Sequence, residues 1–96
     1  MIEVRQTDVF ADWIGGLRDD RARMRVEVRI RRLQLGNPGD AKSVGEGVNE
    51  LRIDYGPGYR VYFTWRGKTL IVLLAGGDKR TQARDIQTAL ELARNL

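Results

Sequence analysis

Two short segments of the chain hold the side chains best suited to bind an anion or move a proton. The first runs from Val48 to Trp65, and its apolar and polar residues alternate on both sides of Gly56-Pro57-Gly58. This alternation around a glycine–proline turn predicts a β-hairpin. Because successive side chains of a strand point to opposite faces, one face of the hairpin is expected to pack into a core. That apolar face holds Leu51, Ile53, Tyr59, Val61, Phe63 and Trp65.

The other face of the hairpin is polar and carries Glu50, Arg52, Arg60, Tyr62 and Thr64. We expect Arg52 and Arg60 to be neighbours across the strands. Two arginines can clamp a phosphate and stabilise the charge that builds up in a transition state. Tyr62 can stack on a base or supply a proton, and Glu50 lies close by. The alternative is an ordinary exposed sheet face, with a cross-strand Glu–Arg pair and a solvent-facing tyrosine.

The second segment is Gly76-Gly77-Asp78-Lys79-Arg80, between a predicted strand and a predicted helix. It places Lys79, Arg80 and free backbone amides at a strand end, where they can reach an anion held by the hairpin. The spacing of a Walker phosphate loop is absent. The alternative is a surface turn, in which the glycines permit the bend and Lys79 is solvated.

The amino-acid composition excludes several kinds of functional site. The chain has no cysteine and no histidine, so disulfides, thiolate metal sites and a histidine general base are excluded. We expect neither a metal nor a cofactor. The formal net charge is +4, and residues 18–32 alone hold seven arginines against three acidic residues. This basic segment fits a polyanion or an acidic protein partner, although a solvated helix face explains it equally well.

The remaining patterns predict one α+β domain over residues 1–96, with helices packed on one face of a largely antiparallel sheet. No apolar run approaches the roughly 18 residues of a membrane span, and the N-terminus lacks a secretory signal, so a cytoplasmic location is expected. The run TLIVLLA is apolar on both faces, which predicts a central strand covered on both sides. The predicted order is β-α-α-β-β-β-α. It begins with strand 2–5, a helix capped by Thr7 or Asp8, and helix 21–35, which Asp19-Asp20 can cap. A loop at 41–47 with a short extended piece around Lys42–Val44, the hairpin, strand 69–75 and a helix after Thr81 follow.

The blocks ELRIDYGPGYRVYF and LLAGGDKRTQARDIQTALELA resemble the RelE/ParE superfamily of bacterial type II toxins. The similarity is greatest to the HigB-like branch of addiction-module killer proteins and extends over nearly the whole chain. It implies a RelE-like fold and a small cytoplasmic toxin that a cognate antitoxin neutralises. Many relatives are ribosome-dependent mRNA interferases, which cleave mRNA without metal through attack of a ribose 2′-OH on the adjacent phosphate.

The resemblance also assigns residues. Arg60 in GYRVYF matches the phosphate-contacting arginine of the family, and Arg52 in ELR matches a second recurrent arginine. Lys79 and Arg80 lie where relatives carry basic residues after the last strand. The histidine and the C-terminal tyrosine that some relatives use are absent, so Glu50, Tyr62 and Lys79 are the candidates for proton transfer.

Two other functions stay open from the resemblance. A ParE-like protein inhibits DNA gyrase without catalysis, and an inactive toxin acts only as a co-repressor with its antitoxin. The expected partners are mRNA, the ribosome and an antitoxin of the helix-turn-helix DNA-binding kind. DNA would be contacted only through that antitoxin, and no membrane is involved.

Overall fold

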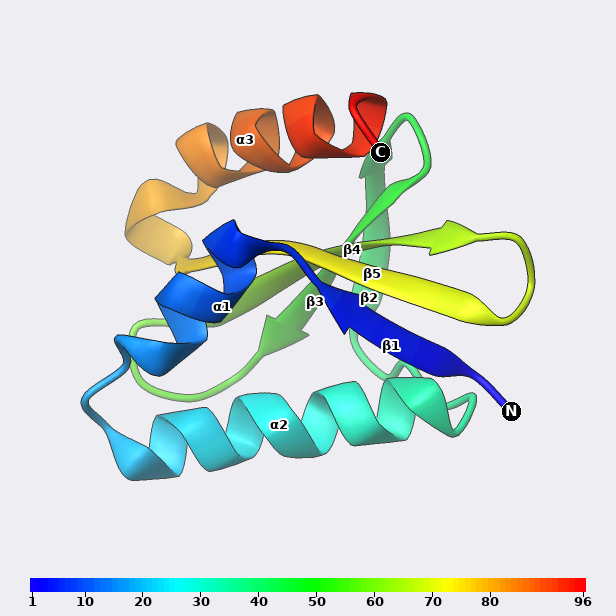
Figure 1. Ribbon diagram of the computed structural model, residues 1–96. Coiled ribbons are helices and arrows are strands. Elements are labelled where there is room, and N and C mark those ends of the chain that lie inside the picture. Colours follow the sequence, from blue (N-terminus) through cyan, green and yellow to red (C-terminus); the bar gives the residue numbers. More distant parts are fainter.

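A computed structural model describes residues 1–96 and contains a single five-stranded sheet (Figure 1). The strand order is β1-β5-β4-β3-β2; β1 pairs parallel with β5, and the other three pairings are antiparallel. The α+β class and the largely antiparallel sheet are confirmed, consistent with a small RelE-like domain. In chain order the elements are β1 (Glu3–Gln6), α1 (Asp8–Gly15), α2 (Asp20–Gln34), β2 (Ala41–Gly45), β3 (Val48–Ile53), β4 (Tyr59–Arg66), β5 (Leu70–Asp78), a 3₁₀ turn η1 (Lys79–Thr81) and α3 (Gln82–Arg94).

Two of the predicted elements differ from the structure. The predicted loop at 41–47 contains the edge strand β2, which is longer than the short extended piece expected around Lys42–Val44, so the order is β-α-α-β-β-β-β-α. This strand has no buried residue, and a half-exposed edge strand leaves little hydrophobic pattern to detect. The strand predicted over residues 69–75 continues to Asp78, so Gly76 and Gly77 lie inside β5 and not in a turn after it.

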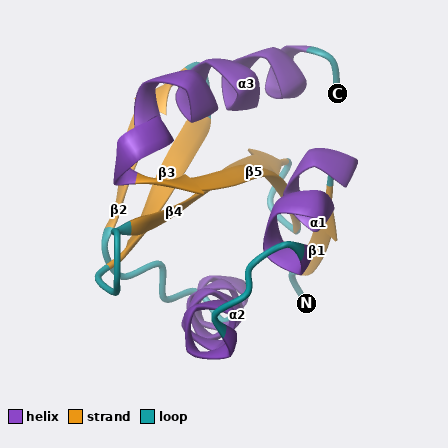
Figure 2. Ribbon diagram, turned by 90° about the vertical axis from the view of Figure 1, so that its left-hand side faces the viewer, coloured by secondary structure: helices purple, strands orange, loops and turns teal.

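Helices cover both faces of the sheet, so the expectation that they pack on one face is wrong (Figure 2). Phe10 of α1 and Val26 of α2 join one core with the predicted apolar face of the hairpin. Ala89 and Leu90 of α3 join a second core with Tyr62 on the opposite face. Two covered faces explain why β5 is apolar on both sides, as its sequence predicted.

The starts of α1 and α2 follow the predicted capping residues. The Thr7 hydroxyl accepts a hydrogen bond from the Phe10 amide at 3.1 Å and donates to the Leu74 carbonyl at 2.6 Å. The Asp19 carboxylate accepts from the amides of Arg21 and Ala22 at 3.0 and 3.2 Å. Each cap satisfies backbone donors that the first helical turn leaves free. None of the three helices combines the length and the apolar character that crossing a membrane requires.

The hairpin has the predicted register, with one exception on its apolar face. Leu51 pairs with Val61 and Ile53 with Tyr59, and all four side chains belong to or pack against the first core. Trp65 is 38% exposed, whereas Phe63 is 3% exposed. Trp65 is the last residue but one of β4, and the turn from β4 to β5 extends beyond the helices in Figure 1. Its expected place in the core is therefore wrong.

Candidate anion-binding site at one end of the sheet

Three adjacent strands bring four basic residues to the same end of the sheet. Arg52 of β3 lies directly opposite Arg60 of β4, as predicted. Arg60 in turn lies opposite Gly77 of β5, and the chain then continues through Asp78 into η1. Lys79 and Arg80 therefore follow the strand that flanks Arg60. The hairpin and the Gly76–Arg80 segment, separate in the sequence, form one local cluster.

Arg60 is the most constrained member of this cluster. Its side chain is 13% exposed, and its Nη1 donates a hydrogen bond to the Gly58 carbonyl at 2.5 Å. Its Nε lies 3.8 Å from Oε2 of Glu50 and is buried without a hydrogen-bond partner. The guanidinium is thus fixed by the turn on one side and by a buried carboxylate on the other. Restricting an arginine in this way reduces the conformational entropy lost when it binds an anion.

Glu50 and Tyr62 are fully buried, so the alternative of an ordinary exposed sheet face with a solvent-facing tyrosine is wrong. Helix α3 covers them: Oε2 of Glu50 accepts from Nε2 of Gln82 at 2.8 Å and from the Tyr62 hydroxyl at 3.1 Å. Burial, followed by the charge of Glu50 and the hydrogen bond to it, raises the pKa of Tyr62. Tyr62 therefore keeps its proton and donates a hydrogen bond to the carboxylate.

Arg52 and Arg80 are held by acidic neighbours. Arg52 binds Oδ1 of Asp40 through Nη2 at 2.8 Å and Nε at 3.1 Å. Arg80 binds Asp78 at 2.9 Å, and this pairing lowers the pKa of Asp78. Lys79 is exposed and makes no ion pair. Among the four basic residues, Lys79 is the one whose charge no acidic side chain balances within 4 Å.

Gly58 is the point at which Arg60 and Lys79 meet. Its φ is +81°, a left-handed conformation that favours glycine. A Cβ atom placed there would lie 2.9 Å from Nη1 of Arg60 and 3.7 Å from Cβ of Lys79. The Gly-Pro-Gly turn therefore allows the guanidinium and the lysine to approach the same stretch of backbone.

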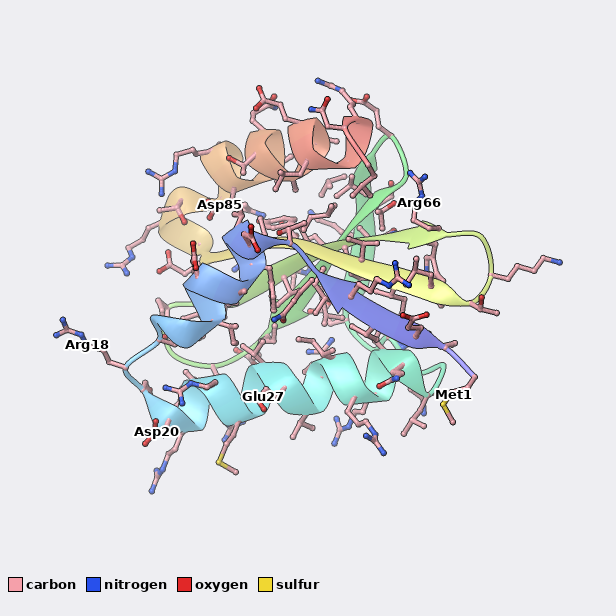
Figure 3. All side chains as sticks on the ribbon, viewed as in Figure 1. Met1, Arg18, Asp20, Glu27, Arg66 and Asp85 are labelled. Atoms are coloured by element: carbon pink, nitrogen blue, oxygen red, sulfur yellow. The ribbon has the colours of Figure 1, made fainter.

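The paired glycines of β5 serve packing. A Cβ on Gly76 would lie 2.1 Å from Cε3 of Trp13, and a Cβ on Gly77 would lie 1.8 Å from Oδ2 of Asp85. Asp85, in the first turn of α3 (Figure 3), also accepts a hydrogen bond from the Thr81 hydroxyl at 2.5 Å. The glycines let α1 approach the strand from one side and α3 from the other. They do not form the bend that the surface-turn alternative required.

Sequence reasoning missed two residues that support this end of the sheet. Gln82 hydrogen-bonds the buried Glu50, and Asp40 pairs with Arg52. Asp40 lies outside both motif blocks, and Gln82 lies inside the second block, where no residue pattern links it to Glu50. The sequence signal that could have indicated this support is the apolar stripe of the last helix. An apolar helix face must pack against a sheet face, and here that packing buries polar residues of the hairpin.

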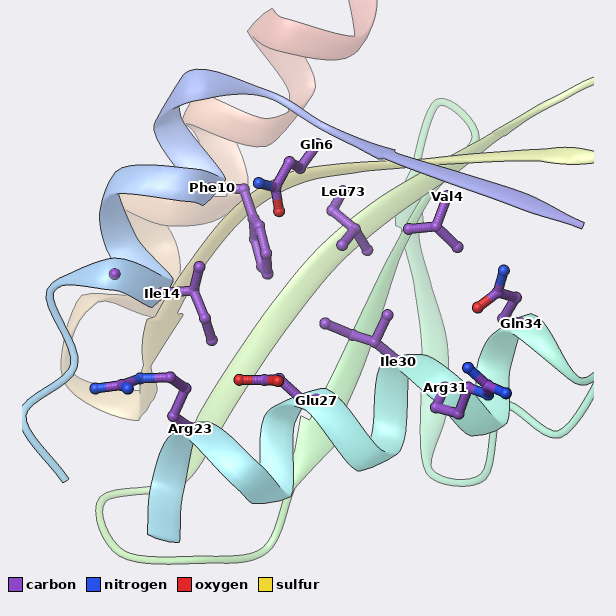
Figure 4. Close-up of a pocket in the computed structure, with 11 residues that line it drawn as sticks. Val4, Gln6, Phe10, Ile14, Arg23, Glu27, Ile30, Arg31, Gln34 and Leu73 are labelled. Carbon is purple, nitrogen blue, oxygen red and sulfur yellow. The ribbon is translucent and has the colours of Figure 1, made fainter. Parts of the chain in front are cut away.

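A groove of about 650 Å³ lies apart from this cluster, between α1, α2 and the sheet (Figure 4). Phe10, Ile14 and Ile30 line it, together with Arg23 and Glu27 of α2. None of the predicted site residues takes part in it. The basic end of the sheet and this groove are distinct features.

The structure thus defines a small α+β protein with a basic cluster at one end of its sheet. The chain belongs to the Gp49-like family of phage-derived proteins (DUF891), whose model matches residues 12–96. It is also 48% identical over 95 residues to a protein of Haemophilus influenzae (strain Rd) described as an uncharacterized protein. That similarity covers 99% of this chain and 96% of the relative.

Proposed function

We propose that this protein is the toxin of a type II toxin–antitoxin pair, of the RelE/ParE superfamily and HigB-like. Its activity is that of a metal-independent endoribonuclease that cleaves mRNA on the ribosome. The observation that carries this proposal is the convergence of Arg52, Arg60, Lys79 and Arg80 at one end of the sheet, with Arg60 fixed by a buried carboxylate. Arginines suit phosphate because the planar guanidinium binds two oxygens at once.

The proposed reaction uses the RNA as its own nucleophile. The 2′-oxygen forms a bond to the adjacent phosphorus while the bond from phosphorus to the 5′-oxygen breaks. A base takes the proton of the 2′-OH, and the departing 5′-oxygen receives a proton, so the products are a 2′,3′-cyclic phosphate and a 5′-OH. Arg60 neutralises the charge that grows on the non-bridging oxygens. The ribosome positions the RNA so that the two oxygens and the phosphorus are in line.

Lys79 is the proposed proton-transfer residue. Glu50 and Tyr62 are completely buried, so we assign them the task of holding Arg60. Lys79 is exposed and can exchange a proton with the RNA. Arginine retains the charge of lysine but does not give up its proton. We therefore expect Lys79→Arg to slow cleavage by about 10²-fold. If Lys79→Arg cleaved as fast as wild type, Lys79 would contribute only its positive charge and would not transfer a proton.

The test of the function is to induce the chain alone and to sequence RNA 5′ ends, beside a supercoiling assay with purified gyrase. The proposal predicts growth arrest, new 5′-OH ends within coding sequences and unaffected gyrase. Gyrase inhibition with intact transcripts would establish the ParE-like alternative. Normal growth with intact transcripts would favour the co-repressor alternative. Co-expression of the proposed helix-turn-helix antitoxin should restore growth.

A further inference from the structure

Helix α2 is apolar on two opposite sides. Ala22, Val26 and Leu33 face the sheet and are buried. On the opposite side lies a second apolar row, the outer stripe, which consists of Met24 and Val28 of α2 and of Leu35, the residue that follows its last turn. Their exposed fractions are 65%, 46% and 70%. The spacing of 24, 28 and 35 places all three on one side of a helix with 3.6 residues per turn. Packing within the chain does not explain why these three exposed positions carry apolar side chains.

The outer stripe is flanked on one side by the arginine shoulder, Arg21, Arg25 and Arg32. None of the three forms an ion pair or a side-chain hydrogen bond, although Arg25 lies over the Tyr55 ring at 4.6 Å. Met24 and Val28 of the outer stripe, the arginine shoulder and Arg29 line a groove of about 580 Å³ that also touches Ile53 of β3. Asp54 is the one acidic residue in its lining. The concave surface thus combines unpaired positive charge with exposed hydrocarbon.

We propose that this face of α2 binds an acidic amphipathic helix of a protein partner. Apolar side chains of the partner would lie along the outer stripe, and a row of carboxylates beside them would pair with the arginine shoulder. The fifteen residues of α2 extend about 22 Å, which a partner helix of about four turns matches. This groove reaches Ile53 and Asp54, next to Arg52 in the chain, but none of the four basic residues proposed to bind RNA lines it, and the inference does not depend on the RNA-cleaving activity.

The same features argue against other occupants. A second copy of this chain docked through α2 would bring the two arginine shoulders together, and like charges at a contact are unfavourable. RNA would satisfy the arginines, but its phosphates offer nothing to Met24, Val28 and Leu35. An acidic amphipathic helix is complementary to both parts of the surface.

The experiment uses the ¹⁵N-labelled full chain and two synthetic acidic peptides of about sixteen residues, roughly 24 Å as helices. In the first peptide, leucines recur at helical spacing among glutamates; in the second, the same residues are scrambled so that no apolar row forms. The inference predicts amide shift changes concentrated between Arg21 and Leu35. It also predicts that the scrambled peptide binds at least about tenfold more weakly.

Two double variants separate the contribution of the outer stripe to peptide binding from that of the arginine shoulder. Each should weaken binding of the first peptide at least about tenfold. Met24→Gln with Val28→Gln removes part of the outer stripe, and Arg21→Glu with Arg32→Glu reverses the shoulder. Arg66→Glu with Lys68→Glu makes the same charge change at the β4–β5 turn and should leave binding unchanged (Figure 3 shows Arg66 there). Circular dichroism verifies that each variant is folded.

Three outcomes would overturn the inference: no binding of the first peptide, equal binding of both peptides, or shift changes that lie outside α2. A single-stranded RNA that binds the same residues more tightly than the first peptide would assign the face to nucleic acid instead.

Discussion

At the scale of single residues, the decisive feature is a buried pair, Arg60 and Glu50. Removing a carboxylate from water is costly unless other groups bind it. Here Tyr62 and Gln82 both donate to Oε2 of Glu50, while Nε of Arg60 stays 3.8 Å away. The pair therefore does not form the close bidentate contact that would consume the guanidinium. Arg60 remains fixed yet able to bind an anion.

Replacement of Tyr62 by phenylalanine tests this support. The variant loses the hydrogen bond to a buried carboxylate, which should lower the free energy of unfolding at pH 7 by about 1.5–3 kcal/mol. Chemical denaturation measures the change. Because the Glu50 carboxylate stays buried with one donor fewer, the proposed cleavage activity should fall as well.

Wild type and Tyr62→Phe also test how the stability depends on pH. Burial and Glu50 raise the pKa of Tyr62, so its contribution to stability is fully present below the usual tyrosine pKa of about 10 and is lost as pH rises further. The difference in unfolding free energy between wild type and Tyr62→Phe should therefore shrink above pH 10. A difference that stays constant to pH 11 would contradict the assignment of the raised pKa to Tyr62.

At the scale of elements, β5 organises the molecule, because α1 and α3 approach it from opposite faces at its glycines. Gly76→Ala would force the Trp13 ring to move, since the new Cβ would lie 2.1 Å from it. We expect a loss of about 1–3 kcal/mol in the free energy of unfolding, the usual cost of overpacking. Calorimetry or urea titration would measure it.

The matched control is Gly15→Ala in α1. A Cβ at Gly15 would meet nothing within 4 Å. This helical position should tolerate alanine and gain up to about 1 kcal/mol, because alanine loses less backbone freedom than glycine. If the two alanine variants proved equally stable, Trp13 would not be packed against Gly76.

Elements with strong local signals were predictable from the sequence. The caps at Thr7 and Asp19, the hairpin with its register and the final helix all follow from patterns within a few residues. Strand β2 was predicted only as a short extended piece within a loop, because an edge strand that pairs on one side needs no apolar alternation. The burial of Glu50 and Tyr62 was missed for another reason: a polar face normally indicates solvent, and only the tertiary position of α3 excludes it here.

The candidate site was partly predictable in the same sense. The opposition of Arg52 and Arg60 follows from the hairpin, and their proximity to Lys79 follows from the pairing of β4 with β5. The partners that hold these side chains, Asp40 and Gln82, could not be predicted. They come from elements whose placement depends on the whole fold.

At the scale of the whole molecule, positive charge lies on two neighbouring surfaces. One is the end of the sheet around Arg60, and the other is the exposed side of α2. The two adjoin at β3, where Arg29 of α2 donates a hydrogen bond to the Arg52 carbonyl. RNA and an acidic protein would be bound by different residues of these surfaces, so variants in one should leave binding to the other intact.

The most direct test of the central claim compares Arg60→Ala with Arg66→Ala in cells induced for each chain. Both changes remove one arginine from β4, but Arg60 lies at the basic end and Arg66 at the opposite end of the strand. Mapping of RNA 5′-OH ends should show that Arg60→Ala lowers cleavage by about 10²–10³-fold, as expected when one donor to transition-state charge is removed. Arg66→Ala should cleave like wild type. Undiminished cleavage by a folded Arg60→Ala protein would contradict the assignment of this end of the sheet as the RNA site.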